Sequence, residues 1–423
     1  MTATVSGKAS KYDQLIEPTR VHGSLYTDDE IFREELEKIW YRTWVFVGHE
    51  SEVPEPNDYV RTAIGPQDLV LSRDREGVLH VLVNRCAHRG NLVCDDQRGN
   101  SSSFRCPYHG WTYKNNGDLL GYPFNRGYGG KGNIEGELGL GVLPRVDSYQ
   151  GFVFASFASE GPSLVEHLGA AARELDRLAG LSPEGKAELT AGWLKHQTGA
   201  NWKLLVENET DGYHPQFVHG AIFGVTGSPI GALYSDKSTA VTRDLGGGHS
   251  ENDLRPEFRK FGEPMRWFGT TEERVFEYAS RMREAYGDED AERVMIEGAP
   301  HVMIFPNLFI AEIQVFAIQP LSAHECVQRS TAVQLRGAGD INKRLVSQCM
   351  GSVGPAGMLL ADDTEMYERN QYGVGMRKPE WLDIRRGVDR ERVDENGFKI
   401  GTATDETGMR GFWGHYKSLM EAE

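Results

Sequence analysis

The chain has 423 residues, a formal net charge of -16 and five cysteines, and its apolar and charged residues stand in the proportions of a soluble globular protein. The negative balance and the absence of a Lys/Arg-rich block argue against a nucleic-acid partner. No segment reaches the roughly 18 uninterrupted apolar residues of a membrane span, and no basic and apolar leader opens the chain. We therefore expect a cytoplasmic protein that makes no membrane contact.

The first expected element is a helix in TDDEIFREELEKIW, residues 27–40. Thr27 and Glu30 have the spacing of a capping box, and the apolar residues that follow recur at helical spacing. We assign residues 1–43 to an N-terminal helical segment that packs on the C-terminal domain.

Residues 44–160 contain short alternating runs (YVRTAI, DLVLSR, VLHVLV, GFVFASF) separated by turn-forming residues, a pattern typical of small antiparallel sheets. Residues 161–423 mix helical periodicity, as in SLVEHLGAAARELDRL, with strands, as in HVMIFPNLFIAEIQVFAIQPL. The fold class is therefore α+β. A glycine- and charge-rich stretch from Leu245 to Glu273 is expected to be either a lid over a site or a surface loop.

The expected β-rich domain carries two cysteine–histidine pairs, Cys86 with His88 and Cys106 with His109. Five thinly spread cysteines do not make a disulfide framework, so these residues are candidate metal ligands. A structural zinc commonly takes a Cys-Cys pair from one arm and a His-His pair from the other. Here each arm offers one of each, as a Rieske [2Fe-2S] cluster requires, so the pattern favours the cluster, with zinc as the alternative.

A second group of metal-binding residue types lies in NWKLLVENETDGYHPQFVHG, where Asp211, His214 and His219 share one broad face at helical spacing. Pro215 interrupts that helix, so we expect two helical pieces that meet near His214. Two histidines and one carboxylate form the facial triad of mononuclear non-haem Fe(II) oxygenases, which leaves positions open for O2. Asp211 is the nearest carboxylate, and a distant one is the alternative.

The stretches CAHRG and CPYHGWTY resemble the Rieske signature of the large (α) subunits of aromatic-ring-hydroxylating dioxygenases. The resemblance implies an N-terminal Rieske domain and a C-terminal mononuclear-iron catalytic domain of helix-grip fold. It also implies a terminal oxygenase that uses O2 to convert an aromatic acid or hydrocarbon into a cis-dihydrodiol. Electrons would come from NAD(P)H through a reductase, a ferredoxin or both. The implied assembly is a trimer of α subunits, either alone or with a small β subunit.

The resemblance also assigns residue roles. The family pattern D-x-Y-H-x4-H makes His214 and His219 iron ligands, and makes Asp211 a hydrogen-bonded bridge to the Rieske histidine of a neighbouring subunit. In GPAGMLLADD, which resembles G-P-A-G-x4-D-D, the second aspartate, Asp363, is the carboxylate ligand. Asp362 is the competing choice, which a helix would point about 100° away.

We expect an apolar substrate cavity, with Asn208 or Glu207 near the iron. The other expected lining residues come from the segment around the histidines, from a strand pair that resembles the family's H-x-x-I-F-P-N stretch, and from a position before GPAG: Phe217, Phe223, His301, Met303, Phe305, Leu308 and Val353. The competing hypotheses are a Rieske monooxygenase or demethylase, a Rieske electron carrier without catalysis, and a zinc-stabilised binding module.

Overall fold

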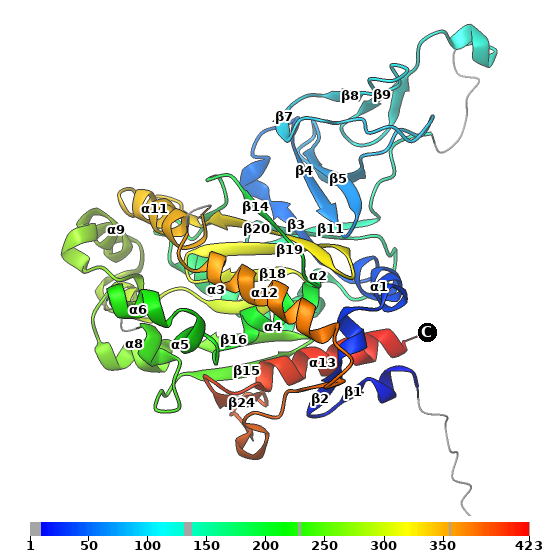
Figure 1. Cartoon of the computed structure of the whole chain (residues 1–423). Helices are drawn as coiled ribbons and strands as arrows, with labels where there is room; N and C mark the ends of the chain where they lie inside the picture. Colours follow the sequence, from blue (N-terminus) through cyan, green and yellow to red (C-terminus); the bar gives the residue numbers. More distant parts are fainter. Residues whose placement is uncertain (1–9, 131–137, 227–229, 355–356, 423) are drawn as a thin grey trace, which may run out of the picture.

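The computed structural model describes residues 10–130, 138–226, 230–354 and 357–422. The chain forms a smaller β-rich unit, drawn mostly in blue and cyan, and a larger unit built on one long sheet with helices on both faces (Figure 1). The expected α+β class is confirmed. Within the described ranges, no helix combines the length and the apolar character that crossing a bilayer requires.

The β-rich unit follows the alternating runs of the sequence. Its strands are β3 (Val45–His49), β4 (Asp58–Ile64), β5 (Gln67–Arg73), β6 (Leu79–Val83), β7 (Arg98–Asn100), β8 (Ser103–Arg105), β9 (Thr112–Lys114), β10 (Leu119–Gly121), β11 (Arg145–Tyr149) and β12 (Phe152–Ser156). They form three sheets with the orders β6-β5-β4-β7, β10-β9-β8 and β11-β12-β3. The β4–β5 hairpin closes with Ile64 paired to Gln67, and Gly65 supplies the positive φ (55°) that such a short turn favours.

The larger unit is built on an antiparallel sheet of nine strands in the order β14-β20-β19-β18-β17-β16-β15-β24-β23. The strands are β14 (Leu194–Thr198), β15 (Val241–Gly246), β16 (His249–Asp253), β17 (His301–Ile304), β18 (Leu308–Ala311), β19 (Gln314–Ser322), β20 (Glu325–Ala332), β23 (Arg392–Val393) and β24 (Lys399–Thr402). Shorter pairings join β1 (Ile16–Glu17), β2 (Arg20–His22) and β22 (Trp381–Asp383), and β13 (Ala187–Glu188) with β21 (Gln334–Leu335).

Helices cover both faces of this sheet, because successive strand residues point to opposite faces. Met303 and Phe309 share a core with α4 (Trp202–Thr210), α12 (Leu360–Val374) and α13 (Thr407–Glu421). Val302, Ile304 and Leu308 share the other core with α3 (Ala172–Gly180), α8 (Arg255–Phe261), α9 (Phe276–Tyr286) and α10 (Asp288–Glu297). α4, which leads into the segment of His214 and His219, and α12, which carries Asp363, therefore lie on the same face of the sheet.

The remaining helices are short, except for α11. They are α1 (Asp29–Glu35), α2 (Leu164–Leu168), α5 (Pro215–Val218), α6 (Gly220–Thr226), α7 (Ile230–Leu233) and α11 (Ile341–Val353), with a π-helical turn over Leu36–Trp40. Single 3-10 turns lie at Tyr12–Gln14, Gly23–Tyr26, Glu50–Glu52, Asn125–Tyr128, Gly169–Ala171, Arg266–Phe268, Glu272–Val275 and Val388–Arg390.

The N-terminal helix begins one residue later than its capping pattern predicts. Asp28, not Thr27, is the cap, since its carboxylate accepts the amides of Glu30 and Ile31. The segment then lies against the C-terminal helix: the Lys38 ammonium donates to the Met420 carbonyl at 2.6 Å.

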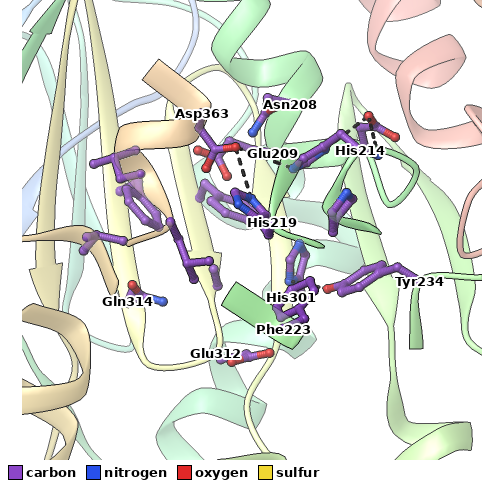
Figure 2. A pocket seen from close by; sticks show the side chains of 18 residues that line it. Asn208, Glu209, His214, His219, Phe223, Tyr234, His301, Glu312, Gln314 and Asp363 are labelled. Atoms are coloured by element: carbon purple, nitrogen blue, oxygen red, sulfur yellow. Dashed lines mark hydrogen bonds and ion pairs between the residues drawn. The ribbon is translucent and has the colours of Figure 1, made fainter. Parts of the chain in front are cut away.

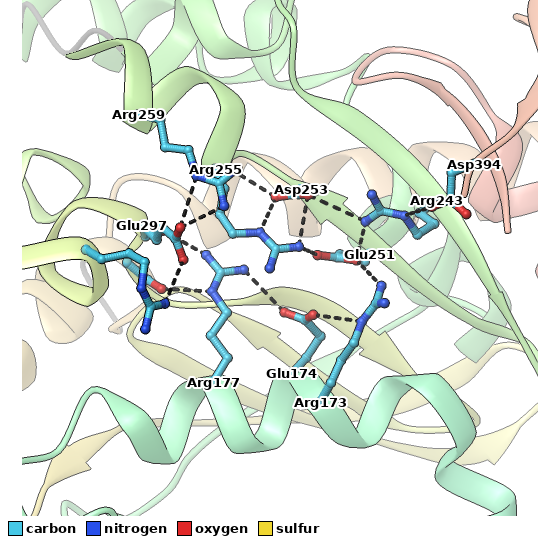
Figure 3. A network of polar contacts seen from close by, with 12 residues as sticks. Arg173, Glu174, Arg177, Arg243, Glu251, Asp253, Arg255, Arg259, Glu297 and Asp394 are labelled. Atoms are coloured by element: carbon cyan, nitrogen blue, oxygen red, sulfur yellow. Dashed lines mark hydrogen bonds and ion pairs between the residues drawn. The ribbon is translucent and has the colours of Figure 1, made fainter. Parts of the chain in front are cut away.

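The stretch from Leu245 to Glu273 is neither a lid nor a plain loop, so both expectations for it are wrong. Its glycines form the tight turn between β15 and β16, and every residue of β16 is buried. A network of charged side chains joins it to α3 through Arg173 and Glu251 at 3.1 Å, and to α10 through Arg259 and Glu297 at 2.7 Å (Figure 3). In that network Arg243 binds Glu251 at 2.6 Å, and Arg255 binds Asp253 at 2.7 Å.

Candidate metal centres and substrate cavity

Two loops of the β-rich unit have the same construction. In the first, the Cys86 amide donates to the Asn91 carbonyl and the Gly90 amide donates to the Cys86 carbonyl, both at 2.9 Å. The second loop repeats this pattern around Cys106 and Gly110, at 2.8 and 3.0 Å. Both glycines have positive φ (72° and 70°), which side-chain-bearing residues rarely adopt. Each loop therefore presents one cysteine and one histidine in matching geometry.

The sulfur side of this site is buried and its imidazole side faces outward. Cys86 and Cys106 are 3% and 1% exposed, whereas His88 is half-buried and His109 is exposed. The two imidazole rings lie 4.6 Å apart between centroids. The Tyr113 hydroxyl lies 3.1 Å from the Cys86 sulfur, where it can donate to a thiolate.

The donors of this site fit a two-metal cluster better than a single zinc ion. Within the described residues, three such donor atoms come within 4.8 Å of one another only at His214, His219 and Asp363. The four cysteine and histidine donors thus do not converge on one point, as tetrahedral zinc requires. His88 Nδ1 is buried and has no hydrogen-bond partner in the described structure, as expected for a nitrogen reserved for a metal.

In the larger unit, a break in the helix brings two histidines together, as expected. α4 ends at Thr210, and α5 starts with Pro215 in its first turn and His214 as its N-terminal flanking residue. Asp363 reaches the same point from the first turn of α12. Its Oδ1 lies 3.7 Å from His214 Nε2 and 3.2 Å from His219 Nε2 (Figure 2).

These three side chains fit a mononuclear metal. Asp363 Oδ1, which lies 3.2 Å from His219 Nε2, is buried without a hydrogen-bond partner among the described residues, which is costly unless a metal or water satisfies it. Asp362 is exposed and is not part of the group. Two imidazoles and one carboxylate leave coordination positions open for O2. Of the neighbouring GPAG element, Pro355 and Ala356 lie outside the described residues.

Asp211 lies beside this group but is not one of its three members. It flanks the end of α4, and its carboxylate accepts the Tyr213 amide at 2.5 Å and the His214 amide at 3.3 Å. Its Oδ2 is also 3.2 Å from His214 Nδ1, the ring nitrogen that faces away from Asp363. Asp211 can therefore orient His214 and fix its tautomer.

A cavity of about 160 Å³ opens beside the three metal-binding side chains. Of the expected lining residues, Asn208, Phe223, His301 and Val353 border it. Glu207 does not, because it points to the other side of α4, where the Tyr26 hydroxyl donates to it at 2.5 Å.

Four other expectations for the lining are wrong. Phe217 is 73% exposed, because it lies on the outer side of the single turn α5. Met303 and Phe305 lie farther along the sheet from His301 and are packed in the core under α4 and α13. Leu308 points to the opposite face of β18, and its neighbour Phe309 borders the cavity instead.

Further lining residues were not predicted from the sequence. They come from α4, from the segment after α7, and from the β18–β19 hairpin: Glu209, Tyr234, Phe309, Ala311, Glu312, Gln314 and Phe316. The signal that could have found the strand residues is the alternation from His301, since β17 pairs His301 with Ala311 and Met303 with Phe309.

Burial changes the charges of several lining groups. It lowers the pKa of His301 to about 4, so this imidazole is neutral at pH 7. It raises the pKa of Glu312 to about 7. Burial also raises the pKa of Glu209 well above its usual range, and the Asp363 carboxylate adds to this, although the Gln328 amide donates to Glu209 at 2.8 Å and opposes it.

Comparison with known proteins agrees with this arrangement. Residues 43–144 match the Rieske [2Fe-2S] domain family, and residues 186–422 match the ring hydroxylating alpha subunit (catalytic domain) family. The large subunit of anthranilate 1,2-dioxygenase from Acinetobacter baylyi is 30% identical over 386 residues, which cover 87% of this chain and 80% of that one.

A second relative has a different reaction in its name. The α subunit of an N,N-dimethyl phenylurea N-demethylase from Sphingobium is 36% identical over 219 residues, which are 51% of this chain and 47% of that one. Among solved structures, naphthalene 1,2-dioxygenase from Rhodococcus superposes with a TM-score of 0.81 at 27% identity, covering 96% of this chain and 95% of that one. The chain therefore belongs to the ring-hydroxylating dioxygenase family as a terminal oxygenase α subunit, an oxidoreductase with a Rieske [2Fe-2S] domain and a non-haem iron catalytic domain.

Proposed function

We propose that this α subunit catalyses the O2-dependent cis-dihydroxylation of an aromatic ring bound in the cavity beside His214, His219 and Asp363. The observation that supports this most directly is that three metal donors within 4.8 Å of one another border a cavity of about 160 Å³. An engineered cavity of about 150 Å³ binds benzene, so the space suits a single ring. Iron held by these three side chains would supply the activation of O2 that an aromatic ring requires.

The other side chains that line the cavity bind the ring and provide hydrogen-bonding groups. Phe223, Phe309 and Phe316 line the cavity and hold the ring by apolar contact. His301 is neutral at pH 7, with the Tyr234 hydroxyl 3.5 Å from its Nδ1, so the pair can exchange a hydrogen bond without adding charge.

Cys86, His88, Cys106 and His109 would hold the [2Fe-2S] cluster, which would supply electron transfer from NAD(P)H through a reductase, a ferredoxin or both. In one chain the two metal sites lie in different units, well separated (Figure 1). This separation supports transfer between protomers of a trimer, with Asp211 at the junction. The presence of a small β subunit is a further part of this proposal.

A second candidate is oxidative N-demethylation, a monooxygenase reaction that would use both metal sites in the same way. The observation that favours it is the 36% identity to a phenylurea N-demethylase subunit over half of the chain. The two reactions differ in product, since dihydroxylation gives a cis-diol and demethylation releases formaldehyde.

The test combines metal analysis with product identification. We expect about three irons per chain, a Rieske-type EPR signal after reduction, and substrate-dependent O2 uptake that yields a cis-diol when a reductase is supplied. Formaldehyde from an N-methylated substrate, without a diol from any ring tested, would replace the first candidate by the second. A colourless protein that retains zinc would overturn both.

A further inference from the structure

The end of the cavity formed by the β18–β19 hairpin carries polar groups that metal binding does not use. Glu312 and Gln314 lie there, away from Asn208 and Asp363 (Figure 2). Within the described residues, the Glu312 carboxylate makes no hydrogen bond or ion pair. Gln314 is only 8% exposed, and its Oε1 has no hydrogen-bond partner in the described structure. At this end of the cavity, the partly exposed Glu312 carboxylate and the buried Gln314 Oε1 are therefore two acceptors without a protein partner among the described residues.

The backbone at Glu312 is unusual for its residue type. Ala311 pairs with Gln314, so Glu312 and Ile313 form a two-residue turn, and Glu312 has a φ of 57°. Glycine or asparagine is favoured at such a position, because a side chain is strained there. A glutamate with a strained backbone, whose carboxyl lies on the cavity wall, is typical of a functional position.

The charges of the lining exclude an anionic substrate at this end. Within the described residues, the cavity is lined by the carboxyl groups of Glu209, Asp211, Glu312 and Asp363 and by no lysine or arginine. A substrate carboxylate would find no counter-ion in this lining, and above pH 7 it would meet the charged Glu312 carboxylate. A bare hydrocarbon would cover Glu312 and Gln314 and leave their oxygens unpaired, which is also unfavourable.

We propose that Glu312 and Gln314 select a single-ring aromatic substrate that carries a hydrogen-bond donor, an amino or a hydroxyl group, at the end of the ring away from the iron. An amino substituent donates one N–H to the Glu312 carboxylate and its other N–H to Gln314 Oε1, whereas a hydroxyl has a single proton and donates it to the Glu312 carboxylate. The inference rests on the proposed function, because it takes this cavity to be the substrate site.

The test measures binding by calorimetry at pH 8, with aniline, phenol, toluene and benzoate as probes, on protein that contains both metals. Aniline or phenol should bind about tenfold tighter than toluene, as expected for one hydrogen bond to a charged group, and benzoate should bind most weakly. In Glu312→Gly, which keeps a residue suited to the turn, the preference over toluene should fall to about threefold or less, because only the neutral Gln314 acceptor remains. Glu325→Gln is the matched control: this carboxylate ends the next hairpin of the same sheet, lies outside the cavity lining and should leave the preference unchanged.

Two outcomes would overturn the inference: benzoate or toluene binding tighter than both donors, or an unchanged preference in Glu312→Gly. These outcomes leave the proposed function intact if the wild-type protein still oxidises toluene or benzoate. Failure of the proposed function looks different, since the protein would then lack iron or oxidise none of the probes.

Discussion

Glu207 offers a sharp test of how α4 is held in place behind the metal-binding residues. Its Oε1 accepts hydrogen bonds from the Tyr26 hydroxyl at 2.5 Å and from the Trp413 indole at 2.8 Å. Burial raises the pKa of this carboxyl from its ordinary value of 4.5 to about 7. The amide oxygen of glutamine can accept both hydrogen bonds, so Glu207→Gln removes the charge and keeps the contacts.

The pH dependence of folding stability follows from the proton that Glu207 binds in the folded and in the unfolded state. Between pH 4.5 and pH 7 the folded protein binds a proton at Glu207 that the unfolded chain has lost, so folding stability falls as pH rises through this window. Below the window the group is protonated in both states and costs nothing. Above it, the charged and buried carboxylate costs about 3 kcal/mol. The stabilisation by Glu207→Gln should therefore be about 2 kcal/mol larger at pH 8 than at pH 5.5.

Urea denaturation followed by tryptophan fluorescence at the two pH values measures this difference. Glu35→Gln is the matched control, because Glu35 is a buried carboxylate whose partner is the buried Lys203 ammonium. Neutralising Glu35 leaves that ammonium without a counter-ion, so we expect a loss of about 3–5 kcal/mol at both pH values. A Glu207→Gln protein that is less stable than wild type at pH 8, or equally stabilised at both pH values, would refute the reasoning.

Three further changes test the metal sites and the buried network. Asp363→Ala should lower the iron content from about three to about two per chain and leave the cluster spectrum unchanged, whereas Asp362→Ala should keep all three irons. An equal loss of iron in both variants would contradict the ligand assignment. Asp211→Asn should retain both metals, yet its reduced cluster should stay reduced when substrate and O2 are added in stopped flow; normal reoxidation argues against the bridging role. Arg177→Met removes a partner of the buried Glu174 and should cost about 3 kcal/mol in urea denaturation, and a change below about 1 kcal/mol would contradict it.

The metal-binding residues could be predicted from the sequence because their chemistry restricts the residue types. Two loops that each carry a cysteine and a histidine are a rare pattern, and so is a helix that a proline interrupts next to a histidine. The structure brings the donor atoms of His214, His219 and Asp363 within 4.8 Å of one another. Asp363 is 144 residues beyond His219 in the chain. Its position was expected only from the family resemblance, since nothing local relates it to the histidines.

The cavity wall was harder to predict because it depends on strand register. A shift of one residue moves a side chain to the other face of a sheet. Because of this alternation, Leu308 lies in the core while its neighbour Phe309 borders the cavity. His301, Met303 and Phe305 do share a face, but the helices above it decide where the cavity ends. The sequence gives the periodicity of β17 and not the position of those helices.

The β18–β19 hairpin has a turn that local sequence preference does not mark. Its turn residues, Glu312 and Ile313, include none of the glycine, asparagine or proline that mark a hairpin, so the sequence reads as one unbroken strand. A turn that local preference disfavours has to be held by the pairing on both sides, here Ala311 with Gln314 and Ile310 with Val315. Function is the physical reason to keep a glutamate at such a turn, because the same hairpin with glycine would fold with less strain and would lose its carboxylate on the cavity wall.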